Sequence, residues 1–76
     1  MTFEKAKEIR TQLRQVEINN YDGKLIEGHK VKIVENTHNI NKPYYTLTID
    51  GQTTTRRCTI KTALVKAFEW FDRQGN

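Results

Sequence analysis

Residues 44–58 read YYTLTIDGQTTTRRC, two strand-like segments joined by a short turn. Large apolar residues take every second position of the first segment, the period of a strand with one buried face, and they are Tyr45, Leu47 and Ile49. Asp50-Gly51 is a strong signal for a two-residue type I′ turn. The threonine-rich segment 52–58 then returns as a second strand. The stretch therefore predicts an antiparallel hairpin.

Strict alternation assigns the two sides of the returning strand. If Cys58 faces the core, Thr54 and Arg56 share its side. The opposite side then carries Thr53, Thr55 and Arg57, together with Tyr44, Thr46 and Thr48 of the preceding strand. This second set predicts a polar, solvated sheet face.

A further strand precedes the hairpin. Residues 30–35 alternate, with Val31 and Ile33 inward, and residues 36–42 are polar and rich in turn formers. Residues 24–28 are open to two interpretations, because Leu25 and Ile26 could form a short strand or a loop pinned to the core. The sheet is therefore expected to have three strands, or four if this segment also pairs.

Amphipathic helices flank these strands. Near the start of the chain, apolar residues recur three and four apart after a suitable N-cap, Thr2, and they are Phe3, Ala6, Ile9, Leu13 and Val16. A second stripe begins after Thr59 and contains Ile60, Ala63, Leu64, Ala67, Phe68 and Phe71. We expect one α+β domain over residues 1–76, with both helices on one face of the sheet.

Composition excludes several classes of protein. A single cysteine, Cys58, permits no intramolecular disulfide, and no apolar run is long enough to span a membrane, so a cytoplasmic location is expected. His29 and His38 with one cysteine form no recognisable metal motif, and no glycine-rich phosphate loop or paired carboxylates are evident. The sequence therefore predicts a protein that is not an enzyme, without cofactor, metal or small-molecule substrate.

Positive charge is concentrated in the middle of the chain. The formal net charge is +4, and residues 28–61 hold two acidic residues, Glu35 and Asp50, against six basic ones, Lys30, Lys32, Lys42, Arg56, Arg57 and Lys61. Such asymmetry favours a basic patch and a nucleic-acid partner. The phosphate contacts predicted are Arg56, Arg57, Lys61 and Lys66, with support from Lys30, Lys32 and Arg10.

Each of these residues also has a structural interpretation. Threonines are good strand formers, and arginines keep an edge strand soluble. Tyr44 could stack on a base or simply pack across the sheet, and Trp70 could cap the edge of the core or contact a partner. Arg10 and Arg14, one helical turn apart, could serve solvation alone.

The element order resembles that of the double-stranded-RNA-binding domain, a helix, a three-stranded antiparallel sheet and a helix. His29–Glu35 resembles the first strand of that family, Asn36–Pro43 its first loop, and Tyr44–Gly51 its second strand and turn. Thr59–Lys66 is similar to the lysine-bearing start of its second helix. The resemblance implies contacts to phosphates and to duplex shape, with little base specificity.

The chain departs from that family at two places. Where the family has adjacent lysines, only Lys61 is present, beside Ile60, and the first loop has His38 but no Gly-Pro. The N-terminal DNA-binding domains of some mobile-element integrases have a comparable arrangement and read DNA with the sheet face. The leading hypothesis is a module that binds RNA or DNA mainly through the phosphate backbone. The alternative is a small regulator that binds an acidic protein surface, such as a phage-encoded inhibitor of a host defence complex.

Overall fold

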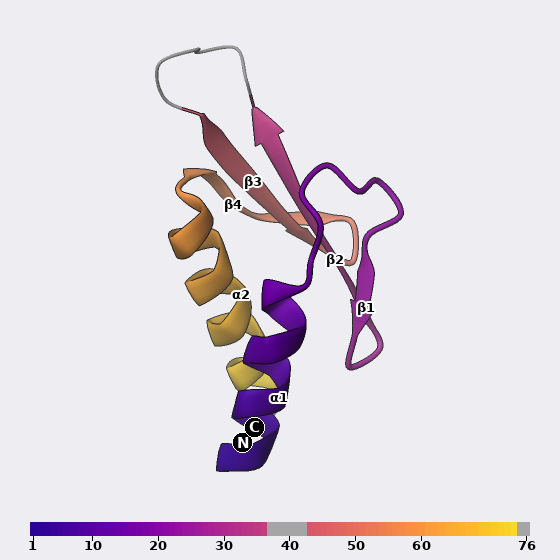
Figure 1. Ribbon diagram of the computed structural model, residues 1–76, viewed down its shortest axis with the longest axis vertical. Coiled ribbons are helices and arrows are strands. Elements are labelled where there is room, and N and C mark those ends of the chain that lie inside the picture. Colours follow the sequence, from indigo (N-terminus) through magenta and orange to yellow (C-terminus); the bar gives the residue numbers. More distant parts are fainter. Residues whose placement is uncertain (37–42, 75–76) are drawn as a thin grey trace.

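Each strand of the sheet pairs with its neighbour along the chain. The computed structural model describes residues 1–36 and 43–74 (Figure 1). Its elements are α1 (Phe3–Arg14), β1 (Lys24–Ile26), β2 (His29–Asn36), β3 (Tyr44–Ile49), β4 (Gln52–Cys58) and α2 (Ile60–Gln74). The strands form one antiparallel sheet in the order β1-β2-β3-β4. The predicted α+β fold is confirmed, with the sheet in its four-stranded form.

Two tight turns set the register of the sheet. Asp50 and Gly51 have φ angles of 54° and 81°, as the sequence predicted for a type I′ turn. Glu27 and Gly28 have φ angles of 52° and 80° and join β1 to β2 in the same way. Glu-Gly is a weaker turn signal than Asp-Gly. The sequence therefore did not decide whether residues 24–28 form a strand or a loop. The family that the element order resembles has three strands, so β1 is additional to its pattern.

Side-chain caps begin both helices. The hydroxyl of Thr2 accepts a hydrogen bond from the backbone N–H of Lys5 at 3.2 Å. The hydroxyl of Thr59 accepts one from the N–H of Thr62 at 3.1 Å. Each cap satisfies a donor that has no partner within its helix.

Neither helix in the described part of the chain is long and apolar enough to cross a membrane.

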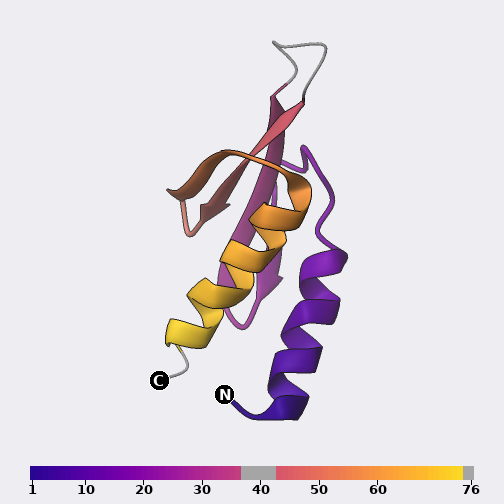
Figure 2. The same ribbon diagram turned by 90° about the vertical axis from the view of Figure 1, so that its left-hand side faces the viewer.

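One core lies between the helices and one face of the sheet (Figure 2). The helices contribute Ile9, Leu13, Ala63, Ala67 and Phe71, the segment after α1 contributes Val16, and the sheet contributes Ile26, Val31, Ile33, Leu47, Ile49 and Cys58. Tyr45, Leu64 and Phe68, which the sequence placed in the core, are only partly buried at its margin. The opposite face of the sheet is left uncovered by the two helices.

Phe3 was expected in the core, and this prediction is wrong. Its side chain is 81% exposed. The buried residues of α1 begin two turns later, at Ile9, so the first turn extends past the core to the end of the molecule where both termini lie (Figure 1). Helical spacing identified the correct face of α1 but not where along the helix that face meets other elements.

Two register shifts overturn the strict alternation expected of β4. Tyr45 lies opposite Cys58 and Leu47 lies opposite Thr55, so β4 has one residue more than β3 between these pairs. A second extra residue lies between Thr55 and Thr53. Thr55 therefore shares the inner side with Leu47, whereas Thr54 and Arg56 are exposed. Such bulges are common on edge strands, which they protect against pairing with other chains.

The predicted loop between β2 and β3, with His38 and Lys42, lies outside the described residues. The segment before β1 runs along the part of β2 that extends beyond its pairing with β1. Ile18 forms a parallel bridge with Ile33, and the N–H of Asn19 donates to the carbonyl of Ile33 at 2.8 Å. An ion pair of 2.7 Å between Lys5 and Glu27 connects α1 to the turn after β1.

Candidate nucleic-acid interface

The uncovered face of the sheet carries the residues that alternate with the core. Val31 and Ile33 are buried beneath the helices, so Lys30 and Lys32 of β2 lie on the opposite face. Lys32 is paired with Thr48 of β3, and Thr48 with Thr53 of β4. A lysine and two hydroxyls therefore form one row across three strands.

A second row lies nearer the other end of β3. Tyr44 is opposite Asn36, and two residues further along Thr46 is opposite Val34. The guanidinium of Arg57 in β4 lies 5.9 Å from the centre of the Tyr44 ring, a distance at which a cation is attracted to an aromatic face. The contact brings an arginine and an aromatic ring together on the uncovered face.

The strands place no carboxylate on this face. The four strands contain a single acidic residue, Glu35, and it is opposite Tyr45 in the set that alternates toward the core. Among the described residues, no carboxylate lies within 4.0 Å of the charged groups of Lys30, Lys32 or Arg57. The face, defined by Lys30, Lys32, Tyr44, Thr46, Thr48, Thr53 and Arg57, is called the basic sheet face below.

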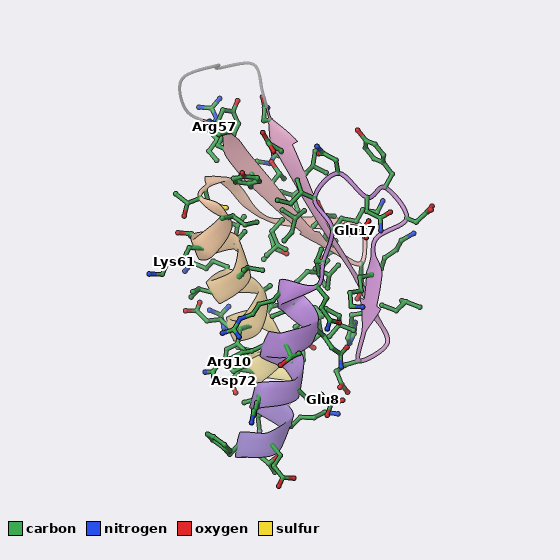
Figure 3. The ribbon with its side chains drawn as sticks, viewed as in Figure 1. Glu8, Arg10, Glu17, Arg57, Lys61 and Asp72 are labelled. Atoms are coloured by element: carbon green, nitrogen blue, oxygen red, sulfur yellow. The ribbon has the colours of Figure 1, made fainter. Side chains whose placement is uncertain are left out.

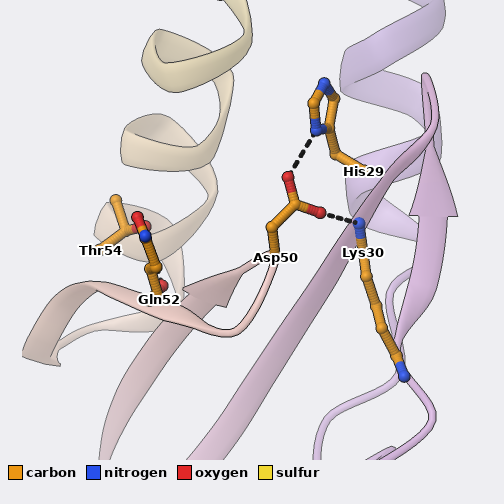
Figure 4. A network of polar contacts seen from close by, with 5 residues as sticks. All are labelled: His29, Lys30, Asp50, Gln52 and Thr54. Carbon is orange, nitrogen blue, oxygen red and sulfur yellow. Dashed lines mark hydrogen bonds and ion pairs between the residues drawn. The ribbon is translucent and has the colours of Figure 1, made fainter.

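Asp50 holds the nearby end of the sheet in place. Its carboxylate accepts hydrogen bonds from the backbone N–H of Lys30 at 3.0 Å and from Nδ1 of His29 at 2.6 Å (Figure 4). These bonds stabilise the ionised form and hold the pKa of the Asp50 carboxyl below its ordinary range. Beside them, the hydroxyl of Thr54 lies 3.5 Å from the carbonyl of Gln52. The network fixes Lys30 at the start of β2.

The remaining cations predicted from the sequence lie elsewhere. Arg10 and Lys61 line a groove between α1 and α2, and Figure 3 shows them along the helices, away from Arg57. Lys66 lies 3.6 Å from the carboxylate of Glu69 on α2. Arg56 is exposed on the edge strand β4. The structure therefore divides the seven predicted contacts between the two sides of the fold.

Trp70 lies on the helical side and belongs to the margin of the core. Its ring is 4.8 Å from the His29 ring and 5.1 Å from the Phe71 ring, both in edge-to-face arrangements. This geometry agrees with a side chain that closes the core between α2 and the start of β2. Tyr44, the other aromatic residue proposed as a partner contact, lies on the basic sheet face.

Cys58 is a buried thiol at the end of β4. The Cys58 thiol is buried and lies 3.4 Å from the carbonyl oxygen of Tyr45, and burial raises its pKa. It lies at the other end of β4 from the His29–Asp50 pair. Within residues 1–36 and 43–74, no group of three histidine, cysteine or acidic side chains could hold a metal ion.

The sequence favoured a solvating role for both Arg10 and Arg14, and the structure places both in the helical groove. Arg14 lines the groove together with Arg10 and Lys61. The spacing of four residues between Arg10 and Arg14 was the available signal, because it places both on one face of α1. Their proximity to Lys61, about fifty residues later in the chain, depends on how α1 and α2 pack.

Comparisons of the chain with models of known protein families, with curated protein sequences and with solved structures find no match.

Proposed function

We propose that this protein binds nucleic acid, RNA or DNA, through the basic sheet face. The observation that carries the proposal is the set of three cations on that face, Lys30, Lys32 and Arg57, none of which has an ion-pair partner in the described part of the chain, with no carboxylate from any strand among them. Lysine, arginine and threonine hydroxyls are common contacts to phosphate oxygens. Tyr44 offers a ring on which a base can stack whatever its identity.

The backbone conformation of Arg57 supports this assignment. Its φ of 53° lies in the left-handed region, which is costly for a residue with a Cβ atom and typical of glycine. Strain of this kind persists where the surrounding structure or a function requires it. In this protein the conformation accompanies a bulge that brings the guanidinium to the Tyr44 ring. An arginine in place of the favoured glycine is consistent with a need for its charge.

The proposal differs in its residues from the one based on sequence alone. Lys30, Lys32 and Arg57 are the principal phosphate contacts, and Arg56 is a peripheral one on the edge strand. Lys66 is excluded because its ammonium faces Glu69, and Arg10 and Lys61 belong to another surface. We propose a binding role without catalysis, in the cytoplasm, where the one thiol would stay reduced.

Binding to labelled oligonucleotides tests the proposal. Fluorescence anisotropy would be measured with single-stranded and duplex RNA and DNA at several salt concentrations. For duplex DNA the log–log slope of affinity against salt should be about −0.9 for each phosphate neutralised. Lys32→Gln should weaken binding to every sequence and reduce that slope by about one.

Lys66→Gln is the matched control, because it removes the same charge from a side chain on the helical side. It should leave the slope nearly unchanged. Equal losses for the two variants would mean that general positive charge, and not the basic sheet face, attracts the nucleic acid. No binding of any oligonucleotide by folded protein at low salt would contradict the proposal as a whole.

A further inference from the structure

A groove between α1 and α2 has a character different from that of the basic sheet face. It encloses about 370 Å³, and its apolar lining consists of Leu13, Leu64, Val65 and Phe68. Leu13 is buried, Leu64 and Phe68 are partly buried, and Val65 is 48% exposed. The groove therefore has a hydrophobic floor that is partly exposed to solvent and that no other described element covers.

Three cations surround this floor. Arg10, Arg14 and Lys61 complete the lining, and no carboxylate contributes to it. The guanidinium of Arg10 lies 4.3 Å from the centre of the Phe68 ring and so joins the charged rim to the apolar floor. In the described part of the chain, none of the three cations has an ion-pair partner within 4.0 Å.

The distribution of charge gives the groove a direction. Asp72 lies one helical turn beyond Phe68 on α2 and outside the lining of the groove, and Figure 3 shows it below Lys61. Anionic groups would be attracted toward Lys61 and Arg14 and repelled near Asp72. A bound segment should therefore place its acidic residues beside the three cations of the lining and not beyond Phe68.

An apolar floor with a cationic rim suits an amphipathic acidic ligand better than a nucleic-acid backbone. Sugars and phosphates are polar and would leave the four apolar side chains without matching contacts. An amphipathic helix binds such grooves by inserting apolar side chains spaced three and four residues apart. The volume is near the lower limit for ligand pockets, which is sufficient for one or two anchoring side chains.

We propose that this groove binds an acidic amphipathic segment of another protein, with its apolar side chains on Leu64, Val65 and Phe68 and its carboxylates beside Arg10, Arg14 and Lys61. The proposal is independent of nucleic-acid binding, because the two surfaces share no residue. A protein that uses both would connect an acidic protein partner to a nucleic acid.

Two synthetic helical peptides test the inference. They have equal length and identical apolar residues on one face, and they differ only in carrying glutamate or lysine at the other positions. Each is labelled with fluorescein and titrated with the complete chain by anisotropy. The acidic peptide should bind about tenfold or more tightly than the basic one, and its affinity should fall with added salt.

Val65→Glu is the informative variant, because the side chain is half exposed and its replacement should leave the fold intact. It should weaken binding of the acidic peptide about tenfold or more, because the new carboxylate repels the carboxylates of the peptide and the apolar contact of Val65 is lost. Lys32→Gln, on the other face of the sheet, should have little effect, and both variants should keep a cooperative thermal transition. Absence of binding by the acidic peptide, or equal binding of both peptides, would overturn the inference. Loss of oligonucleotide binding in Val65→Glu as large as in Lys32→Gln would assign the groove to nucleic acid instead.

Discussion

The carboxylate of Asp50 accepts a 2.6 Å hydrogen bond from Nδ1 of His29, so the β3–β4 turn is joined to the first residue of β2. The same carboxylate accepts the backbone N–H of Lys30, whose carbonyl in turn accepts the N–H of Asp50 at 2.9 Å. On its other side, the His29 ring packs against Trp70 of α2. The pair thus connects the sheet, a turn and a helix at one point.

Asp50→Asn should make unfolding less dependent on acid. The hydrogen bonds from Lys30 and His29 lower the pKa of Asp50 in the folded protein, so its contribution to stability is present above the unfolded pKa. It is lost as pH falls through the lower, folded pKa. Asparagine tolerates the left-handed conformation at this position, so the turn should persist.

Thermal midpoints of both proteins would be recorded from about pH 5 down to about pH 2. The variant should be less stable than the wild type at the upper end of this range. The difference should shrink as pH falls, because protonated Asp50 no longer accepts both bonds as an anion. A difference that stays constant across the range would show that the charge of Asp50 is not the source of its effect.

Phe71→Ala should destabilise the protein more than Phe68→Ala. Phe71 is 4% exposed and its ring lies 5.9 Å from that of His29, so truncation opens a cavity in the core. A cost of about 3–5 kcal/mol is expected, a large part of the stability of a small domain. Phe68 is partly buried and covered by Arg10, so its loss should cost less. Chemical denaturation of both variants measures the order, and the reverse order would mean that α2 is rotated from its observed face.

Cys58 should react with thiol reagents only when the protein unfolds. Its sulfur is buried, its S–H is directed to the carbonyl of Tyr45, and its raised pKa keeps the thiolate scarce. Labelling would be followed by mass spectrometry with increasing denaturant. The rate should rise in parallel with the unfolded fraction, and rapid labelling of the native protein would show that the end of β4 opens readily.

The parts of this fold that the sequence predicts are those with a simple period. The stripe ending at Phe71 and the alternation of Leu47 and Ile49 are local properties, since each follows from helix or strand geometry. The exposure of Phe3 and the bulges before Cys58 depend on where different elements of the fold meet. The spacing of apolar residues within one element does not contain that information. For the same reason, the sequence grouped Lys32 with Lys61, although they lie on opposite sides of the fold.

Arg57→Gly should separate stability from binding. Glycine adopts the φ of 53° without the steric cost that arginine bears, a relief of roughly 1 kcal/mol that its greater chain entropy partly cancels. The thermal midpoint should therefore stay the same or rise. If the basic sheet face binds nucleic acid, the same variant loses one of its three cations and the contact with Tyr44, so its affinity should fall and its salt slope should decrease.

Arg57→Lys is the control for charge, because it keeps the cation but not the planar guanidinium and leaves the left-handed strain in place. It should retain most of the affinity with no gain in stability. Thermal unfolding and anisotropy on the same preparations measure both quantities. Unchanged affinity in Arg57→Gly would remove Arg57 from the interface and leave its left-handed conformation as a feature of the bulge alone.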